Sequence, residues 1–104
     1  MIITSTERIP EKEITQILGI ARGSTVRARN FGSDFIAGLK NLVGGEVSEY
    51  TKLQARSREQ ALKRMVDDAE RLGADAIVNV RFTTSMIMQG MSEILAYGTA
   101  VKIQ

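Results

Sequence analysis

The feature that most constrains the fold is a long stretch of helical periodicity, residues 47–72, that leads directly into a strand pattern. Apolar or small side chains recur along it at steps of three and four residues, at Val47, Tyr50, Leu53, Ser57, Ala61, Met65, Ala69 and Leu72. These steps place them on one face of a helix, and charged residues fill much of the remainder. The period then changes to two, with one parity formed by Ala76, Val78, Val80 and Phe82. That period is typical of a strand.

Ser57 leaves an alternative open within the helical stretch. Followed by Gln60, it matches a capping box, which would begin a new helix at that point. We favour one continuous helix, because the apolar face runs through Ser57 in register. Such a helix would be about 39 Å long at ~1.5 Å per residue. Gly73 stands where a left-handed C-terminal cap is expected.

Shorter elements surround this unit. We expect a short strand at residues 2–4, a strand at 14–28, a short helix at 33–43 capped by Ser33, a strand at 76–84, a turn at 85–91 around Gly90 and a last strand at 93–103. Gly19 and Gly23 interrupt the strand at 14–28. We interpret both as a bulge or bend, in preference to a close approach of the backbone to a ligand.

The last strand carries information about assembly, because apolar or small residues dominate both of its faces. One parity contains Leu95, Tyr97, Thr99, Val101 and Ile103, and the other contains Ile94, Ala96, Gly98 and Ala100. A strand with one face in water would alternate apolar with polar side chains. A long helix covers only one face of a small three-stranded sheet. We therefore expect further copies of the chain to cover the other face, in a closed symmetric oligomer.

Composition excludes several classes of function. The 104 residues predict a single domain spanning 1–104, without cysteine or histidine. Disulfides, thiolate chemistry and the commonest transition-metal ligand are therefore absent. A net charge of +2 is too small to indicate binding to nucleic acid or a membrane. No secretory signal or membrane-spanning apolar run is present, so we expect a cytoplasmic protein.

Three sequence segments together resemble the YbjQ family of small bacterial and archaeal proteins. They are DFIAGL at 34–39 leading to VGG at 43–45, LGADAIV at 72–78, and YGTAV at 97–101. The resemblance implies an α+β fold similar to the dodecin subunit, a β-α-β-β unit with a helix on an antiparallel sheet. It also implies assembly into a ring of five. The family has no established activity, carries the label "putative heavy-metal-binding", and supplies no functional residues to transfer.

Two groups of side chains are candidate ligand sites. Met86, Met88 and Met91 lie around one turn, and their thioethers suit a soft ion such as Cu(I). The alternative is that flexible methionines fill gaps at a subunit contact. Glu46, Glu49 and Tyr50 lie where the long helix begins, and a carboxylate repeated around a ring could bind an ion. The alternative is that acidic residues favour the helix dipole and that Tyr50 is a packed aromatic.

The sequence does not favour catalysis or nucleic-acid binding. No nucleophile stands beside an evident base, so we do not expect an enzyme. Arg22, Arg27 and Arg29 could line one strand face. The chain has only three Phe and two Tyr, and none is interleaved with these arginines in sequence as a stacking platform needs.

These patterns lead to one functional hypothesis and one alternative. We expect a homo-oligomer, a pentamer by resemblance, that binds a small ligand or a metal ion between subunits. The sequence itself requires no cofactor. The alternative is a structural or protein-interaction assembly without any ligand.

Overall fold

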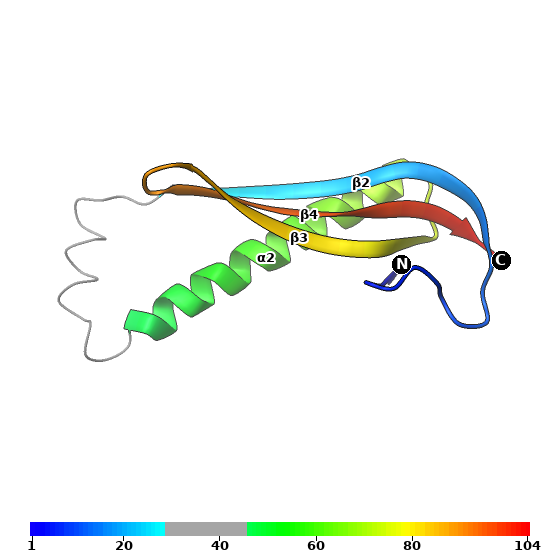
Figure 1. The fold of residues 1–104 in the computed structure, drawn as a ribbon, viewed down its shortest axis with the longest axis horizontal. Helices are drawn as coiled ribbons and strands as arrows, with labels where there is room; N and C mark the ends of the chain where they lie inside the picture. Colours follow the sequence, from blue (N-terminus) through cyan, green and yellow to red (C-terminus); the bar gives the residue numbers. More distant parts are fainter. Residues whose placement is uncertain (29–45) are drawn as a thin grey trace.

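A computed structural model of the chain describes residues 1–28 and 46–104, with side chains described for 1–27 and 54–104. Its elements in chain order are β1 (Ile2–Ile3), β2 (Ile14–Ala28), α2 (Glu46–Arg71), β3 (Ala76–Met88) and β4 (Met91–Ile103), as Figure 1 shows. The short helix expected at 33–43 lies outside the described residues. No helix in the described ranges has the length and apolar character needed to cross a membrane.

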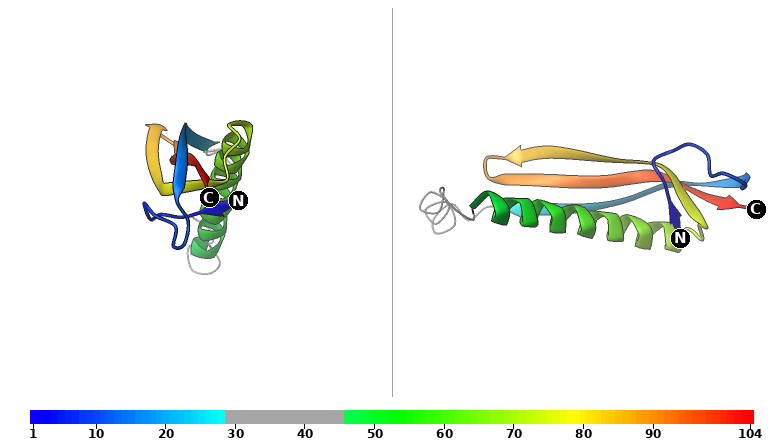
Figure 2. Two further views of the ribbon diagram at one scale, coloured as in Figure 1. Left: turned by 90° about the vertical axis from the view of Figure 1, so that its right-hand side faces the viewer. Right: turned by 90° about the horizontal axis from the view of Figure 1, so that it is seen from below.

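The four strands form one mixed sheet in the order β1-β3-β4-β2. β4 lies in the centre and pairs antiparallel with β2 and β3, while β1 pairs parallel with the start of β3. Helix α2 lies along one face of this sheet (Figure 2). The expected α+β fold is confirmed, and β1 extends the expected three-stranded antiparallel sheet to four strands.

Helix α2 continues through Ser57, so the prediction of one helix is confirmed and the capping box does not start a new one. Ser57 is buried, and it is bonded to β2. Its hydroxyl oxygen accepts a hydrogen bond from Nε of Arg27 at 2.8 Å, and its carbonyl accepts one from Oγ1 of Thr25 at 2.9 Å. Gly73 adopts a φ of 81°, which confirms the left-handed cap.

The boundary predicted for β3 was wrong. The strand does not end at residue 84 but continues to Met88, and β4 already begins at Met91. Ser85 pairs with Glu93 and Met88 pairs with Met91, which leaves only two residues for the turn. Gly90 has a φ of 79°, and this left-handed conformation makes so short a hairpin turn possible.

The expected alternation along β3 was also wrong beyond Val78. Val78 pairs with Thr99 and Arg81 with Tyr97, so an irregularity of one residue lies between them. Asn79 adopts a φ of 55° at this bulge. As a result Val80 packs in the core beneath α2, whereas Val78 faces the other side of the sheet. A bulge thus exchanges the faces of all following side chains.

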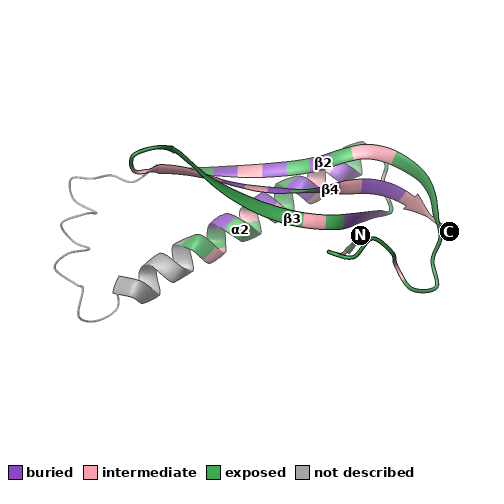
Figure 3. Ribbon diagram, in the orientation of Figure 1, coloured by how far each residue is buried: buried purple, intermediate pink, exposed green. Residues whose placement is uncertain are grey.

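The main core lies between α2 and the sheet and consists mostly of small residues. The buried members are Ala21, Ala61, Met65, Ala69, Ile77, Ile94, Ala96 and Ala100. The opposite side of the sheet is called the outer face below. Among the described residues, Ile9 from the N-terminal segment covers one end of it by packing on Val78 and Val101. Figure 3 shows the buried residues on α2 and on parts of the strands.

The two glycines of β2 have different roles. Gly19 has a φ of 133° at a register shift, which confirms the predicted bulge. Gly23 instead allows close approach of the helix. A Cβ at Gly23 would overlap backbone atoms of Ala61, Arg64 and Met65. Since α2 covers Gly23, this residue does not mark a ligand site.

We predict that Gly23→Ala destabilises the fold by about 3 kcal/mol, because the clash is with helix backbone that cannot move alone. Gly98→Ala is the matched comparison. Its Cβ would lie 2.7 Å from Cγ2 of Ile77 and 2.9 Å from the carbonyl oxygen of Val78, so the overlap there is smaller than at Gly23. Both changes restrict the unfolded chain equally. In urea denaturation, the free energy of unfolding should be highest for wild type, lower for G98A and lowest for G23A. A G23A variant as stable as wild type would contradict the proposed packing.

Candidate functional site

The outer face exposes large apolar side chains in its middle. Ile17 and Ile20 on β2 retain 71% and 68% of their surface, and Val26 retains 50%. These residues pair across to Val101, Thr99 and Glu93 of β4, respectively. An apolar area of this kind on a sheet face is typical of an interaction surface.

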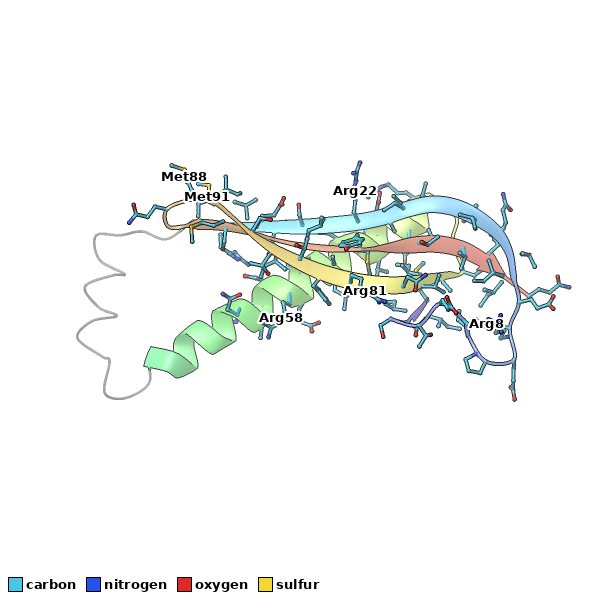
Figure 4. All side chains as sticks on the ribbon, in the orientation of Figure 1. Arg8, Arg22, Arg58, Arg81, Met88 and Met91 are labelled. Atoms are coloured by element: carbon cyan, nitrogen blue, oxygen red, sulfur yellow. The ribbon has the colours of Figure 1, made fainter. Side chains whose placement is uncertain are left out.

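A row of three side chains crosses this face: Arg22 on β2, Tyr97 on β4 and Arg81 on β3. Tyr97 is the Cα partner of both arginines. Directly opposed residues in antiparallel strands project on the same face of the sheet. Tyr97 is 38% exposed, and both arginines are exposed. Figure 4 shows the two arginines on strands either side of β4.

Sequence reasoning missed this row because its members are far apart along the chain. The arginines grouped from the sequence do not share a face. Arg27 lies on the helix side, where its Nη2 donates to Oε1 of Gln60 at 2.8 Å and its Nε to Ser57. Arg29 lies outside the described residues. No aromatic residue is interleaved with these arginines in the sequence, but Tyr97 lies opposite Arg22 across the strand pair. Only the strand register, and no short motif, identifies its neighbour Tyr97.

Both ends of the row are held in place by hydrogen bonds. Nη1 of Arg81 donates to the carbonyl oxygens of Ser5 at 2.8 Å and Val80 at 2.9 Å. The backbone N–H of Arg22 donates to Oδ2 of Asp68 at 3.0 Å. Oδ1 of Asp68 in turn accepts a hydrogen bond from Nη2 of Arg71 at 3.1 Å. The N-terminal segment thus positions one arginine, and helix α2 positions the backbone of the other.

The two long edges of the sheet differ in what covers them. Helix α2 closes the middle of the β2 edge, because Asp68 binds the N–H of Arg22 and Nη1 of Arg64 donates to the carbonyl of Ser24 at 2.6 Å. On β3, the N-terminal segment pairs as far as Val80, whose N–H donates to the carbonyl of Thr4 at 3.0 Å. Past that point, residues 82–88 carry no charge and have no strand partner on this edge within the described chain. Such an edge is a template for pairing with another chain.

The three candidate methionines lie near the tip of the β3–β4 hairpin. Met88 and Met91 are cross-strand partners, and Met86 pairs with Ser92. Met86 is 79% exposed and Met88 is 59% exposed. Figure 4 shows Met88 and Met91 close to the turn. The structure thus places all three near the tip, with Met86 and Met88 exposed, Met91 partly buried, and a register shift between Met86 and the Met88–Met91 pair.

Other metal donors do not gather in the described part of the chain. No group of three or more Asp or Glu residues there has the arrangement of a metal site, and the sequence lacks His and Cys. Glu46, Glu49 and Tyr50 belong to the first turns of α2, but their side chains lie outside those described. The ion site expected at these three residues therefore stays a prediction.

Comparison with known proteins identifies close relatives over the full length. The YbjQ family profile, described as "Putative heavy-metal-binding", matches residues 1–104. A UPF0145 protein of Methanosarcina acetivorans is 60% identical over 103 residues, covering 99% of this chain and 97% of the relative. A UPF0145 protein of Archaeoglobus fulgidus is 56% identical over 104 residues, covering 100% of this chain and 96% of the relative.

One solved structure has a similar fold. It is a DUF74-family protein of unknown function from Pediococcus pentosaceus, with a TM-score of 0.68 and 16% identity. The match covers 100% of this chain and 98% of that protein. At this identity the likeness extends to the fold alone.

Asp68 makes the closure of the β2 edge dependent on pH. The backbone N–H of Arg22 lowers the pKa of Asp68, with smaller contributions from Arg71 and the charge of Arg22, and burial opposes them. A carboxyl whose pKa is lower in the folded state stabilises the fold above its unfolded pKa of about 3.9. That contribution is lost as the pH falls through the folded pKa.

We predict that Asp68→Asn costs about 1 kcal/mol at pH 7, because a charge-assisted hydrogen bond becomes a neutral one. Lowering the pH from 7 to 3 should destabilise wild type more than D68N, as measured by urea denaturation at each pH. Asp67→Asn is the control, since it removes the same charge from the same helical turn. Equal pH dependence of wild type and D68N would contradict this role of Asp68.

Proposed function

The chain belongs to the YbjQ family, and we propose that it acts as a homo-oligomeric ring, of five copies, that binds a small ligand or a metal ion between its subunits. The observation that carries the proposal is the apolar outer face, much of which no other described residue covers. Ile17 and Ile20 are more than two-thirds exposed on β2, an edge strand of a sheet whose other face is already packed on α2. The number five follows from the resemblance to the family.

The energetics favour covering this face with another copy of the chain. Full burial of one isoleucine side chain contributes about 1.5–3 kcal/mol, and the outer face offers Ile17, Ile20 and Val26 together. The uncharged edge at residues 82–88 lies on the same sheet and can extend the contact by strand pairing. The β2 edge is closed by α2 near Arg22 and Ser24, so the two edges are not equivalent. Non-equivalent contact surfaces support the head-to-tail interfaces that form rings.

The hairpin tip is the part of the chain best suited to a soft metal ion. Met86, Met88 and Met91 present thioethers, which are the only soft donors in a chain without Cys and His, apart from Met1 and the buried Met65. Cu(I) and Ag(I) are the ions that such donors select. The family description as "putative heavy-metal-binding" supports the same class of ligand.

A second candidate function is an assembly without ligand. It is favoured by the apolar outer face itself, which accounts for association between copies with no contribution from a bound molecule. In that case the exposed methionines would fill gaps at the contact between subunits.

Native mass spectrometry of the purified protein tests the ring, and we expect a mass of five subunits. Ile17→Glu should convert the ring to smaller species, because a carboxylate buried at a subunit contact beside uncharged sheet residues is strongly unfavourable. Leu72→Glu, at a residue 40% exposed after the end of α2, is the control and should leave the assembly intact. Circular dichroism confirms that both variants stay folded. A wild-type protein that is a folded monomer at micromolar concentration refutes the ring.

Titration with Ag(I), followed by mass spectrometry, tests the metal site. Wild type should bind silver, and the triple variant Met86→Leu, Met88→Leu, Met91→Leu should lose at least roughly tenfold in affinity because leucine provides no donor atom. Met65→Leu is the control, since it changes a buried methionine away from the tip at similar volume. Unchanged silver binding in the triple variant would contradict a site at the tip, whereas a wild-type protein that binds no silver would favour the assembly without ligand.

A further inference from the structure

We propose that the row Arg22–Tyr97–Arg81 on the outer face binds a mononucleotide, whose phosphates contact the two guanidinium groups and whose base stacks on Tyr97. This inference rests on the proposed function, because the row lies on the face assigned to subunit contacts. It deepens that function by naming the chemical class of the small ligand and the residues that bind it.

The spacing of the row suits a ligand with phosphates and a ring. Adjacent strands lie about 4.8 Å apart, so the Cα atoms of Arg22 and Arg81 are about 10 Å apart with Tyr97 between them. The Arg81 guanidinium lies beside the carbonyl of Ser5 at the β3 edge, and Arg22 projects from β2, so the two arginines flank Tyr97 from opposite sides. A polyphosphate can therefore contact both guanidinium groups while remaining next to the aromatic ring.

The charge of the row is not balanced by its neighbours on the outer face. The adjacent rows are Ile20–Thr99–Val78 on one side and Ser24–Leu95–Thr83 on the other, all uncharged. Glu93 is the nearest acidic residue of β2, β3 and β4 on this face, and it lies one row beyond Leu95. Two like charges on a largely uncharged face favour an anionic partner.

Asp68 approaches Arg22 from α2 and lies close enough for electrostatic attraction. Its two oxygens, however, already accept hydrogen bonds from the backbone N–H of Arg22 and from the guanidinium of Arg71. These bonds hold the Asp68 carboxylate at the β2 edge. The N–H donors of the Arg22 guanidinium form no hydrogen bond within the described part of the chain and can serve a ligand.

Arg81 is preorganised for phosphate. Its Nη1 donates to the carbonyls of Ser5 and Val80, which fixes the plane of the guanidinium group. An arginine has five N–H donors, so those on Nε and Nη2 are still available. Parallel donation from a planar guanidinium group is the geometry that recognises phosphate oxygens.

Tyr97 supplies the surface for a planar ring. It is 38% exposed between the two arginines, with Leu95 and Thr99 as its neighbours on the same face of β4. Stacking of a base on an aromatic side chain contributes about 1–3 kcal/mol. One aromatic residue accommodates one base, which points to a mononucleotide and not to a polynucleotide with several stacked bases.

Isothermal titration of the full-length protein with ATP tests this site, with adenosine and inorganic triphosphate as part-ligands. Arg22→Gln and Arg81→Gln should each weaken binding of ATP and triphosphate roughly tenfold, through loss of charge-assisted hydrogen bonds. Tyr97→Leu should weaken the binding of ATP but leave the binding of triphosphate unchanged. Arg58→Gln is the control, since Figure 4 places Arg58 on α2, and it should bind as wild type does. Arg81→Lys keeps the positive charge but removes the planar guanidinium group, and it should therefore still weaken the binding of ATP.

Native mass spectrometry of the same samples separates this inference from the proposed function. An intact ring that binds no ATP overturns the nucleotide site and leaves the ring in place. A monomer that binds ATP through these three residues overturns the ring and supports the site. Equal losses of ATP affinity in R58Q and R22Q indicate general charge attraction and overturn the proposed site. Tighter binding of a single-stranded oligonucleotide than of ATP likewise overturns the assignment to a mononucleotide.

Discussion

The close contact between α2 and β2 is the interaction on which the other features of the structure depend. It is possible because the facing residues are small: Gly23 on the strand, and Ser57, Ala61 and Ala69 on the helix. At this distance, Asp68 and Arg64 reach around the strand to its backbone and close the β2 edge. A helix held at ordinary distance by larger side chains would leave that edge open for pairing.

This packing makes the molecule asymmetric. Helix α2 packs its apolar residues on one face of the sheet and its polar residues on one edge. No other helix in the described ranges covers the outer face or the end of β3. The N-terminal segment covers only the region of Val78 and Val101. The exposed isoleucines, the uncharged edge at 82–88 and the row around Tyr97 are therefore consequences of the same arrangement. The isoleucines and the row share the outer face, and residues 82–88 form its β3 edge.

Local patterns predicted the elements well, because each depends on neighbours in sequence. The continuous helix, its cap at Gly73 and the strand at Ile14–Ala28 all followed from periodicity and residue type. The candidate row at Tyr97 could not be found in this way, since it depends on how β2, β3 and β4 align. Alignment is set by bulges, and each one exchanges the two faces of a strand. Strict alternation through β3 would have placed Val80 opposite Tyr97 and turned Arg81 toward the helix.

The bulge at Asn79 thus determines that Arg81 belongs to the candidate site. Asn is among the few residues that tolerate a positive φ, and its N–H donates to the carbonyl of Thr6 at 3.0 Å. The neighbouring Ser5 carbonyl accepts a hydrogen bond from the guanidinium of Arg81 at 2.8 Å. The same N-terminal segment therefore stabilises the bulge, which turns Arg81 outward, and also holds the side chain of Arg81. The N-terminal segment therefore does more than cover the edge of β3, because it also holds Arg81 in its place in the row.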